Sequence, residues 1–136
     1  MEYLFVYGTL MKNENNDMSK FLSKNAKFYS KGYFYGELYD IGEYPGAITS
    51  KNKNKRVYGN IFTLRTPEKV FSILDEYEEV GEKFPFPNEY KRIKTTVYSM
   101  ENGNFLCWIY LYNHSVKNMP RILSGDYLSY KALNKK

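Results

Sequence analysis

The feature that most constrains the fold is a run of apolar residues near the C-terminal end of the chain. Every position from 105 to 112 is apolar or aromatic, so both faces of a strand formed here would be apolar. Such a strand must be covered on both sides, and we expect it to lie in the centre of a sheet. An Asn-Gly turn within Glu101–Asn104 predicts a hairpin with Tyr90–Met100 as its first arm and Phe105–Asn113 as its second.

Further strands are expected earlier in the chain. Residues 3–7 (YLFVY) are apolar on both alternating faces, and Gly8 ends the run. The segment Phe28–Asp40 alternates and contains glycines, which are typical of a bend or a close backbone approach. Shorter strands are expected at Ala47–Thr49 and Val57–Leu64, on either side of a polar turn. These patterns predict a strand-dominated α+β fold with a strongly curved or closed sheet.

Helices are expected at three places. The clearest has Thr66 as N-cap and Pro67 at its first position, and runs to about Glu79. A short helix over Met18–Lys24 would be capped by Asn16 or Asp17. The stretch Ser124–Lys136 is expected to hold a short helix capped by Ser124, with a frayed basic end from about residue 131. With no repeat or linker, residues 1–136 are interpreted as a single domain.

Composition excludes several classes of protein. The 136 residues are 43% hydrophobic, enough to bury a core. One cysteine, Cys107, and one histidine, His114, offer no zinc-ligand spacing, and no apolar run is long enough to span a bilayer. The start of the chain lacks the pattern of a signal peptide. We therefore expect a cytoplasmic protein with no metal site and no membrane association. We also expect it to be a monomer or a weak homodimer.

The aromatic content of 18% and the net charge of +5 leave one other class open. Rings that stack on bases, next to Lys residues that contact phosphates, are typical of a nucleic-acid-binding module. The tyrosines, however, are spread over nearly every expected strand, rather than grouped on one exposed surface beside the Lys51–Arg56 turn. We therefore expect no nucleic-acid partner, with a weak nucleic-acid binder kept as an alternative.

Helix geometry separates one carboxylate from its neighbours. At about 100° per residue, Val70, Ile73, Leu74 and Tyr77 form an apolar stripe, and Glu78 falls roughly 80° from Val70. The other acids of this run, Asp75, Glu76 and Glu79, point further from the stripe. Burial would raise the pKa of Glu78 and suit it to act as a general base near neutral pH. The other interpretation is a boundary acid whose carboxylate reaches water.

A second candidate lies where the first expected strand ends. Tyr7-Gly8-Thr9-Leu10 places a glycine directly after the strand, and a turn there can direct several backbone N–H groups at an anion such as a substrate carboxylate. A strand that simply ends in glycine has the same pattern, so this feature by itself is weak. Thr9 has no evident base beside it, and a nucleophilic role for Thr9 is set aside.

The order of short motifs resembles the γ-glutamylcyclotransferase-like family, and in particular its γ-glutamylamine cyclotransferase branch. The resemblance spans roughly residues 3–130, and the ordered set is more specific than any single motif. The segments that carry it are Tyr7-Gly8-Thr9-Leu10, Gly36-Glu37-Leu38-Tyr39, Tyr44-Pro45-Gly46-Ala47, Val57-Tyr58-Gly59, Leu74-Asp75-Glu76-Tyr77-Glu78, Tyr90-Lys91-Arg92, Trp108-Ile109-Tyr110 and Ser124-Gly125-Asp126-Tyr127.

The resemblance implies a small mixed β-barrel with flanking helices, and an enzyme that needs no cofactor. In this family the α-amine of a γ-glutamyl group attacks its own γ-carbonyl, which gives 5-oxoproline and a free amine or amino acid. The family's catalytic glutamate corresponds to Glu78, and its substrate loop to Tyr7, Gly8, Thr9 and Leu10. We expect N–H groups of residues 8–10 to hold the glutamyl end, with the hydroxyls of Tyr7 and Tyr110 as lesser candidates.

This chain departs from the family pattern near the expected site. Many members have glycine directly after the catalytic glutamate, where this chain has Glu79, and Gly81–Glu89 forms an additional segment before Tyr90. These departures bear on the specificity for the leaving group more than on the reaction. A non-catalytic protein of the same fold, which senses a γ-glutamyl metabolite, is the other alternative that the sequence leaves open.

Overall fold

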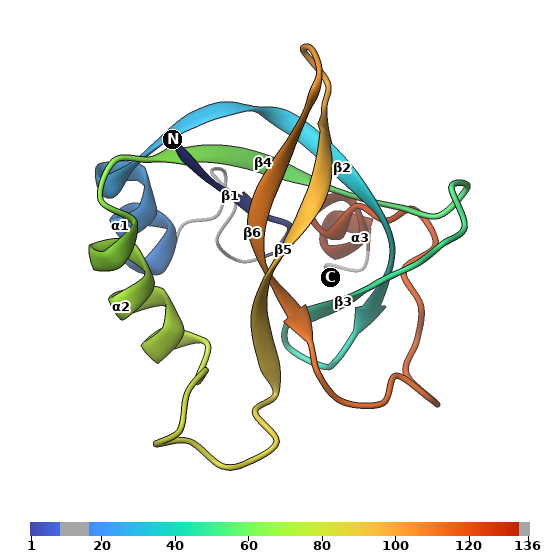
Figure 1. The fold of residues 1–136 in the computed structure, drawn as a ribbon. Coiled ribbons are helices and arrows are strands. Elements are labelled where there is room, and N and C mark those ends of the chain that lie inside the picture. Colours follow the sequence, from blue (N-terminus) through green and yellow to red (C-terminus); the bar gives the residue numbers. More distant parts are fainter. Residues whose placement is uncertain (9–16, 134–136) are drawn as a thin grey trace.

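The structure is a computed structural model, and it describes residues 1–8 and 17–133. Strands and helices follow one another along this part of the chain as Figure 1 shows. The strands are β1 (Glu2–Val6), β2 (Ala26–Asp40), β3 (Pro45–Thr49), β4 (Arg56–Leu64), β5 (Tyr90–Ser99) and β6 (Asn104–Tyr112). The helices are α1 (Asp17–Asn25), α2 (Pro67–Tyr77) and α3 (Tyr127–Leu133).

The sheet closes on itself. Its strand order is β3-β2-β4-β1-β6-β5, and an additional pairing between β2 and β5 joins the two ends. Strands β2, β4, β1, β6 and β5 therefore form a five-stranded barrel, with β3 paired to β2 outside the ring. Strands β1 and β6 run parallel and the other pairs antiparallel. The expected small, mixed and closed barrel is thus confirmed.

The closure of the barrel depends on a close approach at Gly32. This residue of β2 pairs with Ser99 of β5 and, on its other side, with Gly59 of β4. A Cβ atom at Gly32 would lie 2.7 Å from the carbonyl oxygen of Tyr98 and 2.9 Å from Cδ1 of Ile61. No side chain fits there, so glycine lets the two strands meet.

Strand β1 has apolar residues in two core clusters, as its sequence predicts. Leu4 and Val6 belong to a cluster that also contains buried residues of α1 and α2. Phe5, and Tyr7 directly after the strand, belong to a second cluster together with Val97, Cys107 and Ile109. Strand β6 is central, between β1 and β5. Its two-sided burial is not complete, because Leu106, near the hairpin turn, is 57% exposed.

Helix α2 packs on a different face from the predicted one. Its buried residues are Val70, Phe71 and Leu74, whereas Ile73 and Tyr77 are 40% and 45% exposed. The ring of Phe71 packs edge-on against Trp108 of β6, at a centroid distance of 5.5 Å, and this contact places Phe71 on the buried side of the helix. At about 100° per residue, the observed face lies closer to Glu78 than the predicted stripe does.

The expected helix caps differ from those observed. Thr66 makes no side-chain capping hydrogen bond, and the helix ends at Tyr77, two residues before Glu79. At the start of α3, the Asp126 carboxylate accepts a hydrogen bond from the Ser129 N–H at 3.1 Å. The Ser124 hydroxyl, which was expected to cap this helix, instead accepts a bond from the Asp126 N–H at 3.2 Å. None of the described helices is long and apolar enough to span a membrane.

The tyrosines lie on nearly every strand, as expected, but four of the fifteen also gather on one side of the sheet, which the sequence did not predict. Neighbouring ring centroids within the set Tyr33, Tyr35, Tyr58 and Tyr98 lie 5.1–5.9 Å apart, and each of these residues is half-buried. The guanidinium carbon of Arg56, at the end of the Lys51–Arg56 turn, lies 4.4 Å from the ring centroid of Tyr33. Cross-strand pairing between β2, β4 and β5 brings these residues together.

Candidate functional site

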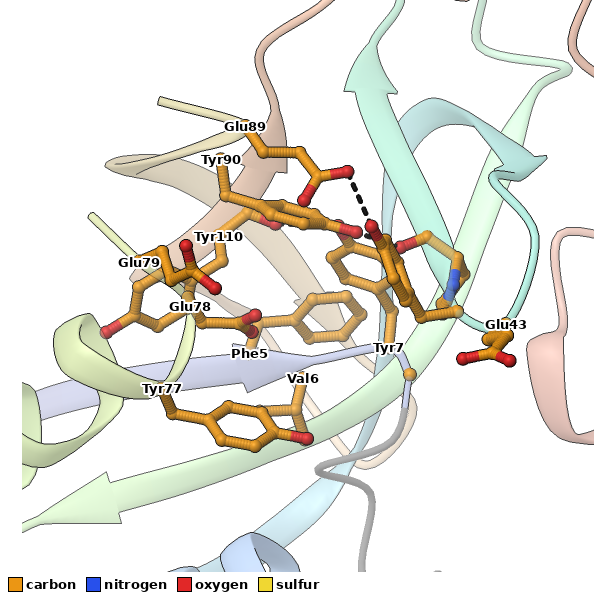
Figure 2. A pocket seen from close by; sticks show the side chains of 13 residues that line it. Phe5, Val6, Tyr7, Glu43, Tyr77, Glu78, Glu79, Glu89, Tyr90 and Tyr110 are labelled. Atoms are coloured by element: carbon orange, nitrogen blue, oxygen red, sulfur yellow. Dashed lines mark hydrogen bonds between the residues drawn. The ribbon is translucent and has the colours of Figure 1, made fainter. Parts of the chain in front are cut away.

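A pocket of about 390 Å³ opens where strand β1 ends, next to the C-terminal end of α2 (Figure 2). Segments from five parts of the chain supply its wall: the end of β1, the turn into β3, the end of α2, the start of β5, and β6 near its end. Thirteen residues line the pocket: Phe5, Val6, Tyr7, Gly8, Glu43, Tyr44, Pro45, Tyr77, Glu78, Glu79, Glu89, Tyr90 and Tyr110.

Glu78 lies in this wall as the first residue after α2. Its N–H group donates to the carbonyl of Leu74 at 2.8 Å, so the last helical turn fixes its backbone. The carboxyl has no hydrogen-bond partner among the described side chains. Burial, with a smaller effect from the nearby charge of Glu89, raises the pKa of Glu78 to about 7. About half of these groups would be ionised near neutral pH, which suits a group that takes and returns a proton.

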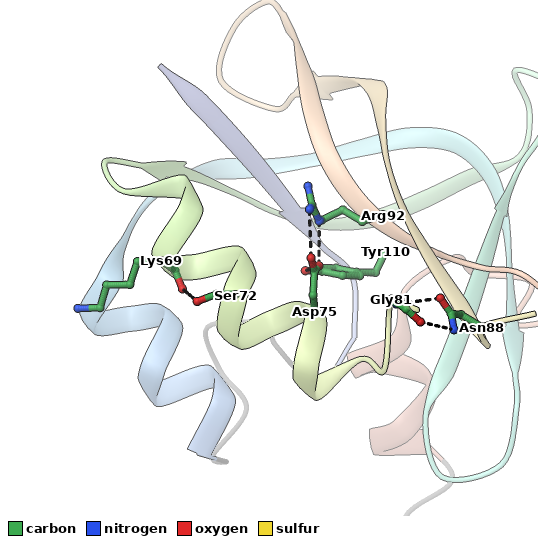
Figure 3. Close-up of polar contacts among 7 residues, drawn as sticks. All are labelled: Lys69, Ser72, Asp75, Gly81, Asn88, Arg92 and Tyr110. Carbon is green, nitrogen blue, oxygen red and sulfur yellow. Dashed lines mark hydrogen bonds and ion pairs between the residues drawn. The ribbon is translucent and has the colours of Figure 1, made fainter. Parts of the chain in front are cut away.

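A hydrogen-bonded clamp holds the end of α2 against the barrel (Figure 3). The Arg92 guanidinium of β5 donates twice to the Asp75 carboxylate, from Nε to Oδ1 at 2.8 Å and from Nη2 to Oδ2 at 3.1 Å. The Tyr110 hydroxyl of β6 donates to the same Oδ1 atom at 2.7 Å. Asp75 lies one helical turn before Glu78, so this clamp sets where the Glu78 side chain enters the pocket.

The segment between α2 and β5 is also fixed in place. The Val80 N–H donates to the Asp75 carbonyl at 2.8 Å, across the end of the helix. The Asn88 side chain pairs with the backbone of Gly81, accepting from its N–H at 2.9 Å and donating to its carbonyl at 3.1 Å (Figure 3). These bonds close the segment into a loop that presents Glu79 and Glu89 at the pocket.

Tyrosine hydroxyls join the remaining walls. The Tyr7 hydroxyl donates to the Tyr110 carbonyl at 2.6 Å and accepts from the Ala47 N–H at 3.2 Å. The Tyr90 hydroxyl donates to the Pro45 carbonyl at 2.6 Å, and the Tyr44 hydroxyl donates to Glu89 Oε2 at 2.6 Å (Figure 2). Burial raises the pKa of Tyr7 and Tyr90. These hydroxyls therefore remain protonated, and each donates its proton in a hydrogen bond that joins two segments of the pocket wall.

The structure brings together most of the residues that the sequence proposed for the site. Tyr7, Gly8, Glu78 and Tyr110 all line one pocket. Thr9 and Leu10, the other two, lie outside the described residues. At Gly8, a Cβ atom would come within 2.7 Å of Pro45 Cγ, so glycine permits this close contact between the end of β1 and the start of β3.

One detail of the expectation is corrected. The hydroxyls of Tyr7 and Tyr110 were candidates to stabilise the substrate, but each already donates its only proton inside the protein, to the Tyr110 carbonyl and to Asp75. These two residues form the wall with their rings. Sequence reasoning did not name Glu43. It placed Glu79 and the segment Gly81–Glu89 near the site without assigning them to its wall, and it noted Tyr44, Pro45 and Tyr90 only as parts of motifs. These residues come from segments that are distant in the sequence. The closed barrel brings them together, and no local sequence pattern encodes that closure.

The described residues contain no group of three or more His, Cys, Asp or Glu side chains placed to hold a metal ion. Cys107 is fully buried, and burial raises the pKa of its thiol to about 12, as expected for a structural cysteine. His114 lies exposed in the segment after β6, and it is not among the residues that line the pocket.

Comparison with known proteins places the chain in a family. The model of the family described as gamma-glutamyl cyclotransferase, AIG2-like, matches residues 4–129. A gamma-L-glutamyl-butirosin B gamma-glutamyl cyclotransferase of Niallia circulans is 33% identical over 114 residues, which are 83% of this chain and 68% of the relative. A protein of Methanocaldococcus jannaschii with a provisional gamma-glutamylcyclotransferase name is 31% identical, over 96% of this chain and 99% of its own length.

A solved structure shows the same fold. The crystal structure of an AIG2-like protein from Mus musculus superposes with a TM-score of 0.71 at 24% sequence identity, and the match covers 93% of this chain and 88% of the mouse chain. The family model covers nearly the whole described barrel, including the segments that form the pocket. The chain belongs to the gamma-glutamyl cyclotransferase, AIG2-like family.

Proposed function

We propose that this protein converts a γ-glutamyl amine or γ-glutamyl amino acid to 5-oxoproline and the free amine, with Glu78 as general acid and base. The observation that carries the proposal is the Glu78 carboxyl itself, which lies in a pocket wall and whose pKa burial raises to about 7. Membership of the family supports a reaction of the cyclotransferase type. The residue roles and the substrate range are our proposal.

The first task of the site is to remove a proton from the substrate. The α-amine of a γ-glutamyl group has a pKa of ~8 and is mostly ammonium at neutral pH, a form that cannot act as a nucleophile. An ionised Glu78 takes one of its protons. Because the pKa values of the two groups lie within about one unit of each other, the transfer has little energetic cost.

The amine nitrogen then forms a bond with the γ-carbonyl carbon of the same molecule, closing a five-membered ring. Electrons move to the carbonyl oxygen and give a tetrahedral intermediate, whose oxyanion must be stabilised. Its collapse re-forms the carbonyl and breaks the bond to the leaving nitrogen, which receives the proton from Glu78. The ring nitrogen still carries two hydrogens after the attack, and it passes one of them by way of Glu78 to the released amine, which leaves as an ammonium. All substrate atoms end in the two products, and neither water nor a covalent enzyme intermediate is needed. The pocket mainly holds the substrate in a folded conformation.

The α-carboxylate of the substrate needs a donor of its own. None of the described residues that line the pocket is Lys or Arg, so no cationic side chain of that wall serves it. In our proposal, backbone N–H groups of Gly8, Thr9 and Leu10 supply hydrogen bonds to the glutamyl end and to the oxyanion. The close packing of Gly8 on Pro45 supports this, because it brings backbone rather than side chain to the pocket.

The decisive experiment measures release of 5-oxoproline from γ-glutamyl compounds: γ-glutamyl-ε-lysine, γ-glutamyl dipeptides and glutathione. We expect turnover of at least one of them, and a loss of about 100-fold or more in kcat for Glu78→Gln with substrate binding retained. Glu76→Gln, which changes an exposed acid on the same helix, is the matched control and should keep wild-type activity. Full activity in Glu78→Gln would contradict the assigned role.

The same experiment separates the enzyme from a sensor. If calorimetry detects binding of a γ-glutamyl compound while no 5-oxoproline forms over hours, the protein binds without catalysis, and the proposed reaction is wrong.

A further inference from the structure

The Asn-Gly turn that joins β5 to β6 has no part in the proposed reaction, but it carries a chemistry of its own. Figure 1 shows this turn at the tip of the β5–β6 hairpin, where it projects beyond the neighbouring strands. Asn102 and Gly103 are both exposed, and neither lines the pocket that contains Glu78. An asparagine side chain can react with the backbone nitrogen of the next residue, and glycine has no side chain to hinder that approach. This pair occurs once in the sequence.

Both reacting groups are free of hydrogen bonds to the part of the chain that the structure describes. The side-chain amide of Asn102 bonds to no described residue, and no described residue accepts a hydrogen bond from the Gly103 N–H. Gly103 has a φ of +78°, and apart from its chain neighbours nothing lies within 4 Å of the place where a Cβ atom would be. The Gly103 nitrogen can therefore approach the Asn102 side chain without breaking a hydrogen bond or displacing another residue.

We propose that Asn102 is a site of spontaneous covalent modification. The Gly103 nitrogen forms a bond with Cγ of Asn102 and gives up its proton, while the bond from Cγ to Nδ2 breaks, so that ammonia leaves with that proton and a succinimide ring remains. Water then adds to one of the two ring carbonyls. Opening at Cγ gives aspartate, and opening at the main-chain carbonyl carbon gives isoaspartate. Water is the only co-reactant, and the reaction is independent of the pocket and of the proposed function.

The turn is connected to the place where the barrel closes. Ser99 pairs with Gly32 of β2, and its hydroxyl shares a hydrogen bond of 2.7 Å with the Ser30 hydroxyl. The same hydroxyl accepts from the Asn102 N–H at 3.4 Å, and the Ser99 N–H donates to the Gly103 carbonyl at 3.0 Å across the turn. Isoaspartate adds one carbon atom to the main chain inside this set of bonds. Its formation should therefore distort the turn and weaken the pairing of β2 with β5.

The test keeps the purified protein in neutral buffer at body temperature for several weeks and maps its peptides by mass spectrometry in mildly acidic buffer. Asn54 is the internal control, because it is exposed in a turn but is followed by Lys55, whose N–H donates to the Asn52 carbonyl at 3.1 Å. We expect conversion of amide to acid at least about 10-fold faster at Asn102 than at Asn54, since a side chain hinders the attacking nitrogen only at Lys55. The Asn102→Ser variant should show no such change in the same peptide.

A second measurement tests the connection to the barrel. Ion exchange separates the modified forms by their added negative charge, and fragmentation in the mass spectrometer identifies isoaspartate. We expect the isoaspartate form to unfold about 3 °C or more below the Asn102→Asp variant, which has the charge without the additional main-chain atom. Conversion at Asn102 no faster than at Asn54 overturns the modification site. An isoaspartate form as stable as Asn102→Asp overturns its effect on the closure of the barrel.

Discussion

At the scale of single residues, the raised pKa of Glu78 should make the proposed reaction dependent on pH. The carboxyl has to be ionised to take a proton, and burial moves its pKa from 4.5 to about 7. We expect kcat/KM to fall below about pH 7, and to fall again above ~8 as the substrate ammonium loses its proton in solution. Initial rates of 5-oxoproline release between pH 5 and about 10 measure both limbs. A flat profile between pH 5 and about 7 would contradict the role of Glu78.

A substitution of Glu89 tests whether electrostatics set the pH at which activity falls. Its negative charge disfavours ionisation of Glu78, so Glu89→Gln should lower the pKa of Glu78 and move the acidic limb to lower pH, by a few tenths of a unit to about one unit. Glu101→Gln, which removes an exposed charge in the β5–β6 turn, is the matched control and should leave the limb in place. A shift to higher pH in Glu89→Gln would contradict this electrostatic account.

At the scale of elements, the clamp on α2 should position Glu78. Asp75 and Arg92 are about one quarter exposed, and their two hydrogen bonds join helix to strand with a third from Tyr110. We expect Asp75→Asn to destabilise the fold by about 1–3 kcal/mol. It should also lower kcat more than it raises KM, because the carboxyl of Glu78 is then less well placed. Urea unfolding and steady-state kinetics measure the two effects.

A second ion pair, between α2 and the loop that follows it, supplies the control. Lys83 and Glu76 form a bridge whose side chains are 65% and 57% exposed, so Lys83→Met should change stability by less than about 1 kcal/mol and leave kcat unchanged. Arg92→Lys keeps a charge and one donor, and should recover part of the kcat that Arg92→Met loses. Equal kcat values for Asp75→Asn and the wild type would show that the clamp does not position Glu78.

The limits of sequence reasoning show most clearly on these elements. Alternation and turn residues predicted the strands, because the side-chain period of a strand is local information. The face of α2 was predicted wrongly, since Phe71 is buried by Trp108, a residue 37 positions away in the sequence. Glu78 was nevertheless singled out, because its position lies next to the buried face of the helix, whether that face is the predicted or the observed one. Glu89 and Tyr44 meet only through the tertiary fold, and nothing local indicated their contact.

At the scale of the whole molecule, the barrel closes only if β2 and β5 can approach each other. A Cβ atom at Gly32 would overlap with the Tyr98 carbonyl oxygen, so Gly32→Ala should force the strands apart and destabilise the protein by about 1–3 kcal/mol. Lys31→Ala, at the exposed neighbouring position, should change stability by less than about 0.5 kcal/mol. Thermal or urea unfolding measures both variants. A Gly32→Ala protein as stable as the wild type would contradict the proposed role of this contact.

The surface of the molecule raises the remaining question, whether the tyrosine group beside the basic turn binds nucleic acid. Base stacking requires an open ring face. Within this group, Tyr33 and Tyr98 stack on each other with planes 21° apart, and the Arg56 guanidinium covers Tyr33 at 4.4 Å. Nearby, Lys55 is bound to Glu37 at 2.9 Å. The rings thus contact one another, and part of the basic charge is neutralised within the protein.

We therefore expect no stable complex with single-stranded RNA or DNA at physiological salt. Fluorescence anisotropy of a labelled oligonucleotide should show no saturation below about 100 µM protein at 0.15 M salt, and only the weak attraction common to basic proteins at low salt. Saturable binding at micromolar protein, with a steep salt dependence and a loss of affinity in Arg56→Gln, would contradict this. It would assign the tyrosine group a function separate from the pocket, because Arg56 does not line the pocket that contains Glu78.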